Sequence, residues 1–207
     1  MTADWIRVGA AVLGAALALS LAPGCALLSP STTAETTKEV LNKMPVDLPQ
    51  RAPRAAVLVV FPPQSGPLYD TTLMAYTVKA YEVAYFSRHE WGANPAQMLQ
   101  PLLVRTMQNT GFFSAVLAPP YAGQHTHALH TEIRELIADF TSEPAALQLS
   151  LRFQLIDGAT GRIVAIKEIS IREPMRDKTP YASVVAANEA TARALLQLAA
   201  FVLDQAG

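Results

Sequence analysis

The sequence predicts a single α+β domain, in which one antiparallel-rich sheet is covered by two main helices. Residues 147–155 alternate between apolar and polar side chains, and a turn at 157–161 leads into a second strand-like segment at 162–172. Two helix-like patterns lie far apart in the chain, at 94–110 and 179–203. Hairpin strands combined with helices at separate points of the chain are typical of the α+β class.

Residues 1–24 indicate a signal peptide that precedes this domain. Arg7 supplies a positive charge, and the apolar segment 8–22 is about fifteen residues long, which is short for a membrane-spanning helix. The segment ends in Leu21-Ala22-Pro23-Gly24-Cys25, which resembles the lipobox of bacterial lipoproteins, although the family usually has Leu in place of Ala22. The resemblance implies cleavage before Cys25 and lipidation of its thiol. An uncleaved inner-membrane anchor, or cleavage at an ordinary site, is the alternative.

Cys25 is the only cysteine of the chain, so no intramolecular disulfide can form. Acylation would consume this thiol, and burial of each acyl methylene contributes about 0.8 kcal/mol to membrane binding. The next residue is Ala26 and not Asp. By resemblance to the sorted lipoproteins of bacteria with two membranes, this favours the outer membrane, with the protein facing the periplasm. Retention in the inner membrane is the alternative.

Residues 25–54 are predicted to form a flexible tether that starts at the lipidated cysteine. The stretch from Ser29 to Arg54 is rich in Ser, Thr and Pro, and at most a short helical turn is expected at 35–44. A random coil of this length spans roughly 30 Å. The folded body would then comprise residues 55–207 and could stand off the membrane.

The body is expected to consist of strands interrupted by two helices. Besides the hairpin, strands are predicted at 55–61, 80–88, 112–117 and 129–140, the last of which also fits a helical face. A bulge is expected near Lys167 in the second strand of the hairpin.

Both helices carry start or stop signals. Asn94 is the expected N-cap of the first helix, Pro95 takes its first position, and Gly111 ends it. Thr179 and Pro180 begin the second helix in the same way. Its apolar stripe consists of Val184, Ala187, Thr191, Leu195, Leu198 and Val202.

A series of short motifs runs through the body in a characteristic order. They are Leu68-Tyr69-Asp70-Thr71, Tyr81-Glu82-Val83-Ala84-Tyr85-Phe86, Trp91, Pro95-Ala96, Pro101-Leu102-Leu103 and Gly111-Phe112-Phe113. In order and spacing these motifs resemble the ABC-type transport auxiliary lipoprotein family, over roughly residues 55–204. One departure is that many members begin a Tyr-rich strand soon after the lipidated cysteine, where this chain has its Pro-rich segment.

The resemblance implies an accessory role without catalysis. Members of the family work with an ABC ATPase, a membrane permease and a substrate-binding protein of the mammalian-cell-entry type, which together move phospholipid or other apolar molecules between membranes. The chain would be the lipid-anchored periplasmic subunit that docks on the permease or the mammalian-cell-entry component. An envelope scaffold or assembly lipoprotein that binds other outer-membrane proteins is the alternative. Apolar sheet edges also allow a homo-oligomer.

Three aromatic residues are candidates for contact with a partner or with lipid. Tyr81, Tyr85 and Trp91 combine large apolar bodies with polar tips, which suits surfaces that meet other molecules. The alternative is that these rings pack the first helix onto the sheet.

Other function classes are not expected. A net charge of −1, with 16% charged residues, provides no basic stripe for nucleic acid. His125, His127 and His130 would not converge on one metal ion, because the third would point away from the other two. The chain has no glycine-rich phosphate loop and no evident set of nucleophile, base and orienting group. We therefore expect no enzyme activity, no metal and no cofactor.

Overall fold

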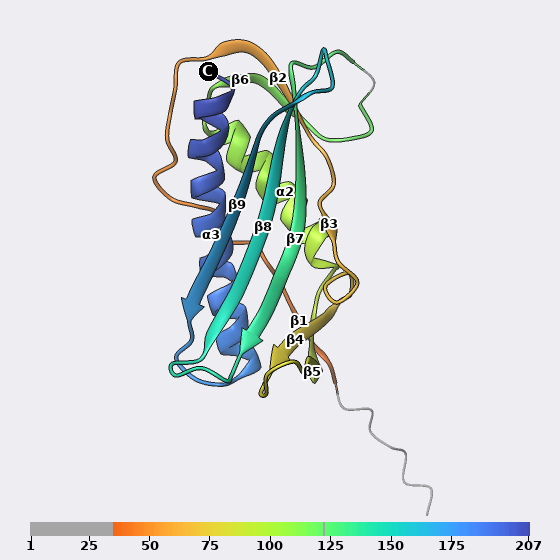
Figure 1. Cartoon of the computed structure of the whole chain (residues 1–207), viewed down its shortest axis with the longest axis vertical. Coiled ribbons are helices and arrows are strands. Elements are labelled where there is room, and N and C mark those ends of the chain that lie inside the picture. The colour runs from red at the N-terminus through yellow and green to blue at the C-terminus, as the bar shows by residue number, and fades with distance from the viewer. Residues whose placement is uncertain (1–34, 122) are drawn as a thin grey trace, which may run out of the picture. The chain divides into compact units, whose positions relative to one another are not determined.

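The computed structural model describes residues 35–121 and 123–207, which do not include the predicted signal peptide or Cys25. Its centre is a meander of three long antiparallel strands (Figure 1). They are β7 (His127–Asp139), β8 (Ala146–Asp157) and β9 (Ile163–Pro174). The predicted hairpin is confirmed, and the ambiguous segment that precedes it is a strand.

The free side of β7 is divided among three shorter strands that run parallel to it. β2 (Arg54–Val60) pairs with the start of β7, β3 (Gln64–Ser65) with its middle, and β4 (Leu73–Thr77) with its end. β6 (Phe113–Leu117) extends the sheet beyond β2. The nine-stranded sheet is therefore mixed. The predicted α+β class is confirmed, and antiparallel pairing is confined to the meander and the β4–β5 hairpin.

Beyond β4 lie two further strands. β5 (Ala84–Trp91) pairs antiparallel with β4, and β1 (Thr37–Glu39) pairs parallel with β5. The strand predicted at 80–88 starts four residues later, because residues 78–83 form the turn between β4 and β5. β1, β3 and β4 are too short or too irregular in pattern to be recognised in the sequence.

Both helices cover the same face of the sheet (Figure 1). α2 (Pro95–Asn109) packs against β2 and β6, and α3 (Pro180–Gln205) packs against β8 and β9. The Asn94 carboxamide accepts a hydrogen bond from the Ala96 N–H at 3.0 Å, which caps α2 as predicted. Gly111, at φ +66°, ends it in the left-handed region that glycine favours. Neither helix among the described residues is long and apolar enough to cross a membrane.

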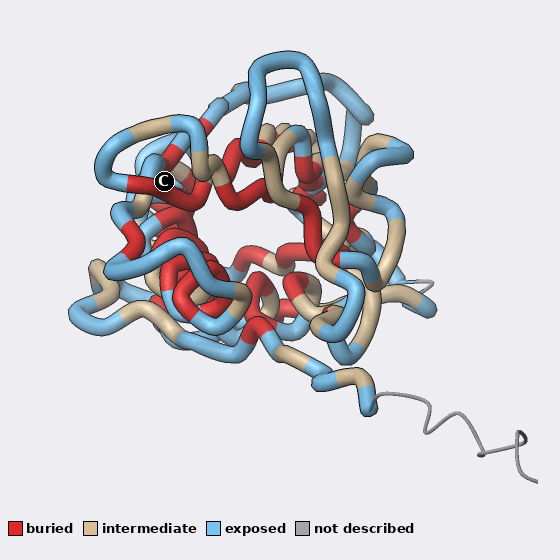
Figure 2. The backbone as a smooth tube through the Cα atoms, turned by 90° about the horizontal axis from the view of Figure 1, so that it is seen from below, coloured by how far each residue is buried: buried red, intermediate tan, exposed pale blue. Residues whose placement is uncertain are grey.

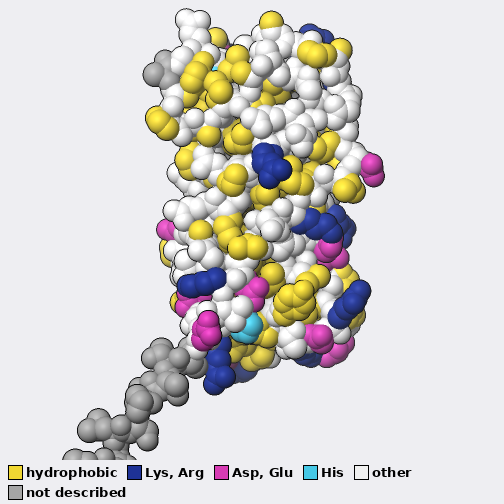
Figure 3. Space-filling view, turned by 180° about the vertical axis from the view of Figure 1, so that it is seen from behind, with side chains coloured by type: hydrophobic (Ala, Val, Ile, Leu, Met, Phe, Trp, Pro, Cys, Tyr) yellow, Lys and Arg dark blue, Asp and Glu magenta, His cyan; other side chains and the backbone are white. Residues whose placement is uncertain are grey.

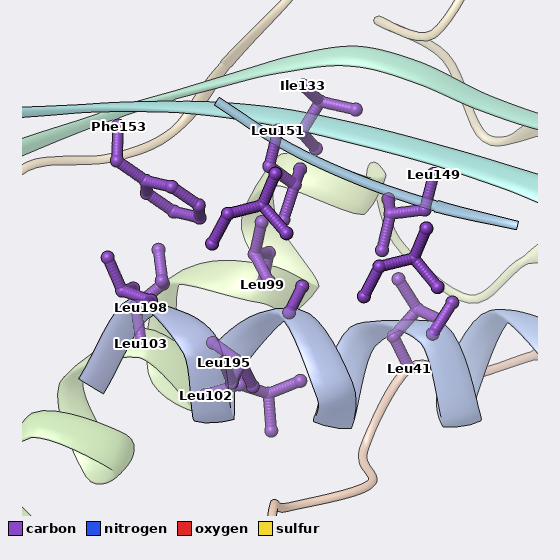
Figure 4. Close-up of a cluster of buried hydrophobic side chains, with 14 of the residues drawn as sticks. Leu41, Leu99, Leu102, Leu103, Ile133, Leu149, Leu151, Phe153, Leu195 and Leu198 are labelled. Carbon is purple, nitrogen blue, oxygen red and sulfur yellow. The ribbon is translucent and has the colours of Figure 1, made fainter. Parts of the chain in front are cut away.

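The hydrophobic core lies between the helices and the sheet (Figures 2 and 4). Leu149, Leu151 and Phe153 descend from β8, and α3 meets them with the stripe that its sequence pattern predicted. On the other face of β8, the intervening side chains are polar, as the alternation requires. The six residues of the α3 stripe are all buried: Val184, Ala187, Thr191, Leu195, Leu198 and Val202.

The structure corrects the predicted boundary between tether and body. Residues from Glu35 onward belong to the folded unit, and Leu41 is only 7% exposed within its core. The Asn188 side chain on α3 holds this segment, since its oxygen accepts from the N–H of Asn42 at 2.9 Å and its nitrogen donates to the Val40 carbonyl at 2.9 Å. The Pro-rich composition of this segment predicted a tether, because contacts with a distant helix cannot be recognised from composition.

One detail of the β8–β9 hairpin also differs from the prediction, and one ion pair crosses it. The irregularity in its register lies beside Leu155 and Ile156, close to the turn, and not at Lys167. Glu168 forms its ion pair with Arg134 of β7 at 3.0 Å, across the intervening strand. This ion pair therefore connects two strands that are not neighbours in the sheet.

Thr131 allows a test of what an unpaired hydroxyl in the core costs in stability. This β7 residue lies opposite Phe153 and is 4% exposed, and its hydroxyl has no hydrogen-bond partner within residues 35–121 and 123–207. Thr131→Val should raise the free energy of unfolding by about 1 kcal/mol, because it removes an unsatisfied buried hydroxyl from a strand.

Thr110→Val is the matched control, measured by the same chemical denaturation. Thr110 is fully buried, but its hydroxyl donates to the Met107 carbonyl at 2.7 Å. Its replacement should lower the free energy of unfolding by about 1 kcal/mol. Equal destabilisation by both variants would show that Thr131 does have a partner.

Candidate functional site

Several titratable groups on the uncovered face of the sheet have pKa values that their surroundings shift. Burial, and next the charge of Asp139, raise the pKa of Glu135. Burial also raises the pKa of Tyr69, with Glu135 and Tyr85 adding to the effect. Glu135, Asp139 and Tyr69 line a hollow of about 420 Å³.

Opposite shifts of two carboxyl groups accompany acid–base catalysis in some enzymes, but the second group here has a structural role. Burial acts to raise the pKa of Asp139, but hydrogen bonds from Thr141 outweigh it and keep the pKa below its usual value. These bonds come from the Thr141 hydroxyl at 2.6 Å and its N–H at 2.8 Å, and they close the β7–β8 turn. The carboxylate of Asp139 therefore acts as a hydrogen-bond acceptor that stabilises this turn.

The three histidines considered as metal ligands, His125, His127 and His130, are dispersed along β7 and the loop before it. The His130 ring stacks on Phe61, with the ring centroids 4.5 Å apart, and His127 lies edge-on to Phe113 at 6.3 Å. Burial lowers the pKa of both histidines, so their neutral forms are favoured. Within residues 35–121 and 123–207, no group of three His, Cys, Asp or Glu side chains is arranged to hold a metal ion.

The three aromatic candidates differ in how far their side chains are buried. Trp91 is 3% exposed and belongs to the core, so the packing alternative applies to it. Tyr85 is half-buried, and its hydroxyl donates to the Leu68 carbonyl at 3.2 Å. Tyr81 is fully exposed at the tip of the β4–β5 hairpin. The structure therefore leaves Tyr81 as the accessible member of the predicted set.

A second exposed aromatic residue lies on the helix-bearing side of the molecule, near the start of α3. Tyr181 is 68% exposed, and Val185 follows one helical turn later. Val40, in the segment beside α3, is also exposed. Hollows of about 550 Å³ and about 450 Å³ lie on the two sides of Tyr181 and Val185. We call this surface, formed by Tyr181, Val185, Val40 and the two hollows, the α3 groove.

The rim of the α3 groove is polar and carries both signs of charge. Lys43 and Glu189 form an ion pair at its edge, and Arg176 and Asp177 line the far hollow. On this side of the molecule, apolar side chains are spread over the whole height, and in the lower half they lie among most of the basic and acidic ones (Figure 3). An aromatic centre with a polar rim is the composition of a protein–protein interface.

The α3 groove was not predicted from the sequence. Tyr181 and Val185 lie one turn apart on the face of α3 that does not carry the buried stripe. An apolar pair at this spacing on the polar face of an amphipathic helix is the signal that could have indicated it. The contribution of Val40 could not be inferred, because it requires the preceding segment to pack beside α3.

Comparison with known proteins identifies one family. The model of the family described as "ABC-type transport auxiliary lipoprotein component" matches residues 40–200, which is most of the chain. No curated protein sequence matches the chain.

Solved structures share the fold. A Xanthomonas campestris protein assigned to the family model DUF330 superposes with a TM-score of 0.70 at 18% sequence identity, covering 83% of this chain and 96% of its own. An uncharacterized protein superposes with a TM-score of 0.67 at 12% identity, covering 81% of this chain and 99% of its own. At such identities these structures establish the fold alone.

Proposed function

The chain belongs to the ABC-type transport auxiliary lipoprotein family, and from this membership we propose that it is a non-catalytic subunit of an ABC-type system for intermembrane transport of lipid or solvent. It is anchored through Cys25 in the outer membrane and faces the periplasm. Its partners are the permease, the ATPase and the mammalian-cell-entry-type protein of that system. The family match over residues 40–200 is the observation that carries this proposal.

The mechanism we propose is positional. The lipid on Cys25 holds the subunit at one membrane, and the folded unit presents the α3 groove to the permease or the mammalian-cell-entry component. Tyr181 and Val185 provide the apolar centre of the contact, and the hollows beside them accept side chains of the partner. The description of the family as a transport auxiliary component supports a role without catalysis.

Tyr181→Ala tests the docking surface. A buried aromatic anchor is worth about 2 kcal/mol or more at an interface, so the variant should weaken partner binding by roughly 30-fold. The measurement is recovery of the permease or the mammalian-cell-entry component with the tagged, lipidated protein from detergent extracts. Because Tyr181 is 68% exposed, its loss should leave the thermal unfolding temperature nearly unchanged.

The matched control is Tyr121→Ala, which removes an exposed aromatic residue from the loop between β6 and β7. It should leave partner recovery at the wild-type level. If the lipidated wild-type protein recovers neither component, the proposed partners are wrong. If Tyr181→Ala and Tyr121→Ala both recover as much as wild type, the partners stand and the α3 groove does not bind them.

A further inference from the structure

The tip of the β4–β5 hairpin, residues 78–83, presents apolar side chains that the fold does not use. Tyr81 is 107% exposed, Val78 62% and Val83 41%. The side chain of Tyr81 therefore contributes nothing to the core. A fully exposed aromatic residue between two exposed valines indicates contact with another apolar phase.

The backbone at Tyr81 supports a role outside the fold. The Glu82 N–H donates to the Lys79 carbonyl at 3.2 Å, which closes a four-residue turn with Tyr81 at its third position. The φ of Tyr81 is +69°, in the left-handed region where glycine would be relaxed and a tyrosine is strained. Strain at an exposed side chain is typical of positions retained for function and not for stability.

The charge of the tip suits a bilayer interface. Its two charged side chains, Lys79 and Glu82, form an ion pair with each other at 2.6 Å, so the tip has no net charge. A tyrosine combines an apolar ring with a polar hydroxyl, and such rings are enriched at the level of lipid headgroups.

The path of the chain places this tip at the end of the folded unit where the described chain begins. β1 runs parallel to β5, with Thr37 opposite His89 and Glu39 opposite Trp91. β5 itself starts beside the tip, at Ala84, so β1 runs away from the tip and its first residue, Thr37, is the end of β1 nearer the tip. Figure 1 shows the hairpin and the start of the described chain at the same end.

The distance from the anchor is short. Glu35 lies ten residue steps after Cys25, and ten steps of an extended chain span at most about 35 Å. A lipid on Cys25 therefore keeps the tip end of the folded unit close to the bilayer surface.

We propose that the β4–β5 tip is a second membrane contact, in which Tyr81, Val78 and Val83 insert into the headgroup region of the bilayer that holds the lipid anchor. This inference rests on the proposed lipidation of Cys25. Two points of attachment limit the tilt of the body relative to the membrane. The α3 groove is thereby held at a defined orientation for its partner.

Tyr81→Trp in the lipidated protein, which is cleaved before Cys25 and therefore lacks Trp5, tests the contact. The protein is reconstituted in vesicles of phosphatidylethanolamine with a minority of phosphatidylglycerol, with and without lipids brominated near the top of the acyl chain. The added tryptophan should show blue-shifted emission and at least twofold quenching by the brominated lipid. The native Trp91 is 3% exposed and supplies a constant background.

Tyr121→Trp is the matched control. β7 is 13 residues long, or about 40 Å. Tyr121 precedes the start of this strand, whereas the tip adjoins its end through the pairing of Thr77 with Asp139. The control tryptophan should therefore emit as in water and remain unquenched. Tyr81→Gly should abolish any tip-dependent bilayer contact without lowering the thermal unfolding temperature, since it relieves the positive φ.

The outcomes separate this inference from the proposals on which it builds. Vesicles that float with the protein, together with an unquenched Tyr81→Trp variant, overturn the tip contact and leave the anchor in place. A blue shift that arises only when the permease or mammalian-cell-entry component is added also overturns it, in favour of a protein contact. If the wild-type protein carries no lipid and does not float with the vesicles, both the anchor and the tip contact are wrong. Partner recovery is measured independently of all three.

Discussion

A Cys25→Ala variant is expected to lose its acyl chains and to disappear from the outer-membrane fraction. The thiol is the proposed attachment point for lipid, and Cys25 is the only cysteine in the chain. Two or more acyl chains, at about 0.8 kcal/mol for each buried methylene, make an anchor effectively permanent, so the expected loss is nearly complete. Palmitate labelling and fractionation of the two membranes measure it, and sensitivity of the cells to detergent or solvent reports on transport.

Ala26→Asp is the matched control for this variant. It leaves the thiol in place, so labelling should persist, and by resemblance to sorted lipoproteins it should move the protein to the inner membrane. Labelled protein in a Cys25→Ala strain would place the lipid elsewhere. Unchanged fractionation of both variants would show that Cys25 does not anchor the chain.

Phe153→Ala is expected to lower the free energy of unfolding by about 3–5 kcal/mol. Phe153 is 0% exposed, and its ring descends from β8 toward Leu103 of α2 and Leu198 of α3 (Figure 4). Its loss would leave a cavity where the sheet meets both helices. A small domain has only about 5–15 kcal/mol of stability, so this change removes a large part of it.

Chemical denaturation followed by far-ultraviolet circular dichroism measures this effect, and Ile166→Ala is the control. Ile166 lies opposite Gln154, the residue next to Phe153, and is 47% exposed. Its replacement should change the free energy of unfolding by about 0.5 kcal/mol or less. A cost below 1 kcal/mol for Phe153→Ala would mean that the helices and sheet do not share one core at this point.

Long elements with regular patterns were predictable from the sequence. The alternation along β8 and the capping residues Asn94 and Thr179 identified strand and helices close to their actual bounds. These signals are local, because side-chain period and cap chemistry act within a few residues of the chain. Short strands such as β1 and β3 carry no such period, and they exist because a distant strand offers backbone hydrogen bonds.

The residues of the candidate surfaces also differ in whether the sequence could identify them. Tyr81 was identified from its aromatic-rich sequence motif, although that segment was predicted to be a strand and Tyr81 lies in the turn before β5. That Trp91 belongs to the core and Tyr181 to the surface depends on which face each element turns toward its neighbours. Burial of this kind is a property of packed pairs of elements, and the order of residues within one element does not specify it.

The sequence by itself determined the proposed anchor cysteine, the α+β class and the resemblance to a transport auxiliary family, since each depends on contiguous residues or on their spacing. Only the tertiary structure decided that the chain from Glu35 onward belongs to the body, and that α3 presents a groove. It also placed the hairpin tip and Glu35, where the described chain begins, at the same end of the folded unit. These features arise where segments distant in the sequence meet. The hydrogen bonds from Asn188 to the segment beside β1 are one such meeting, at a separation of nearly 150 residues.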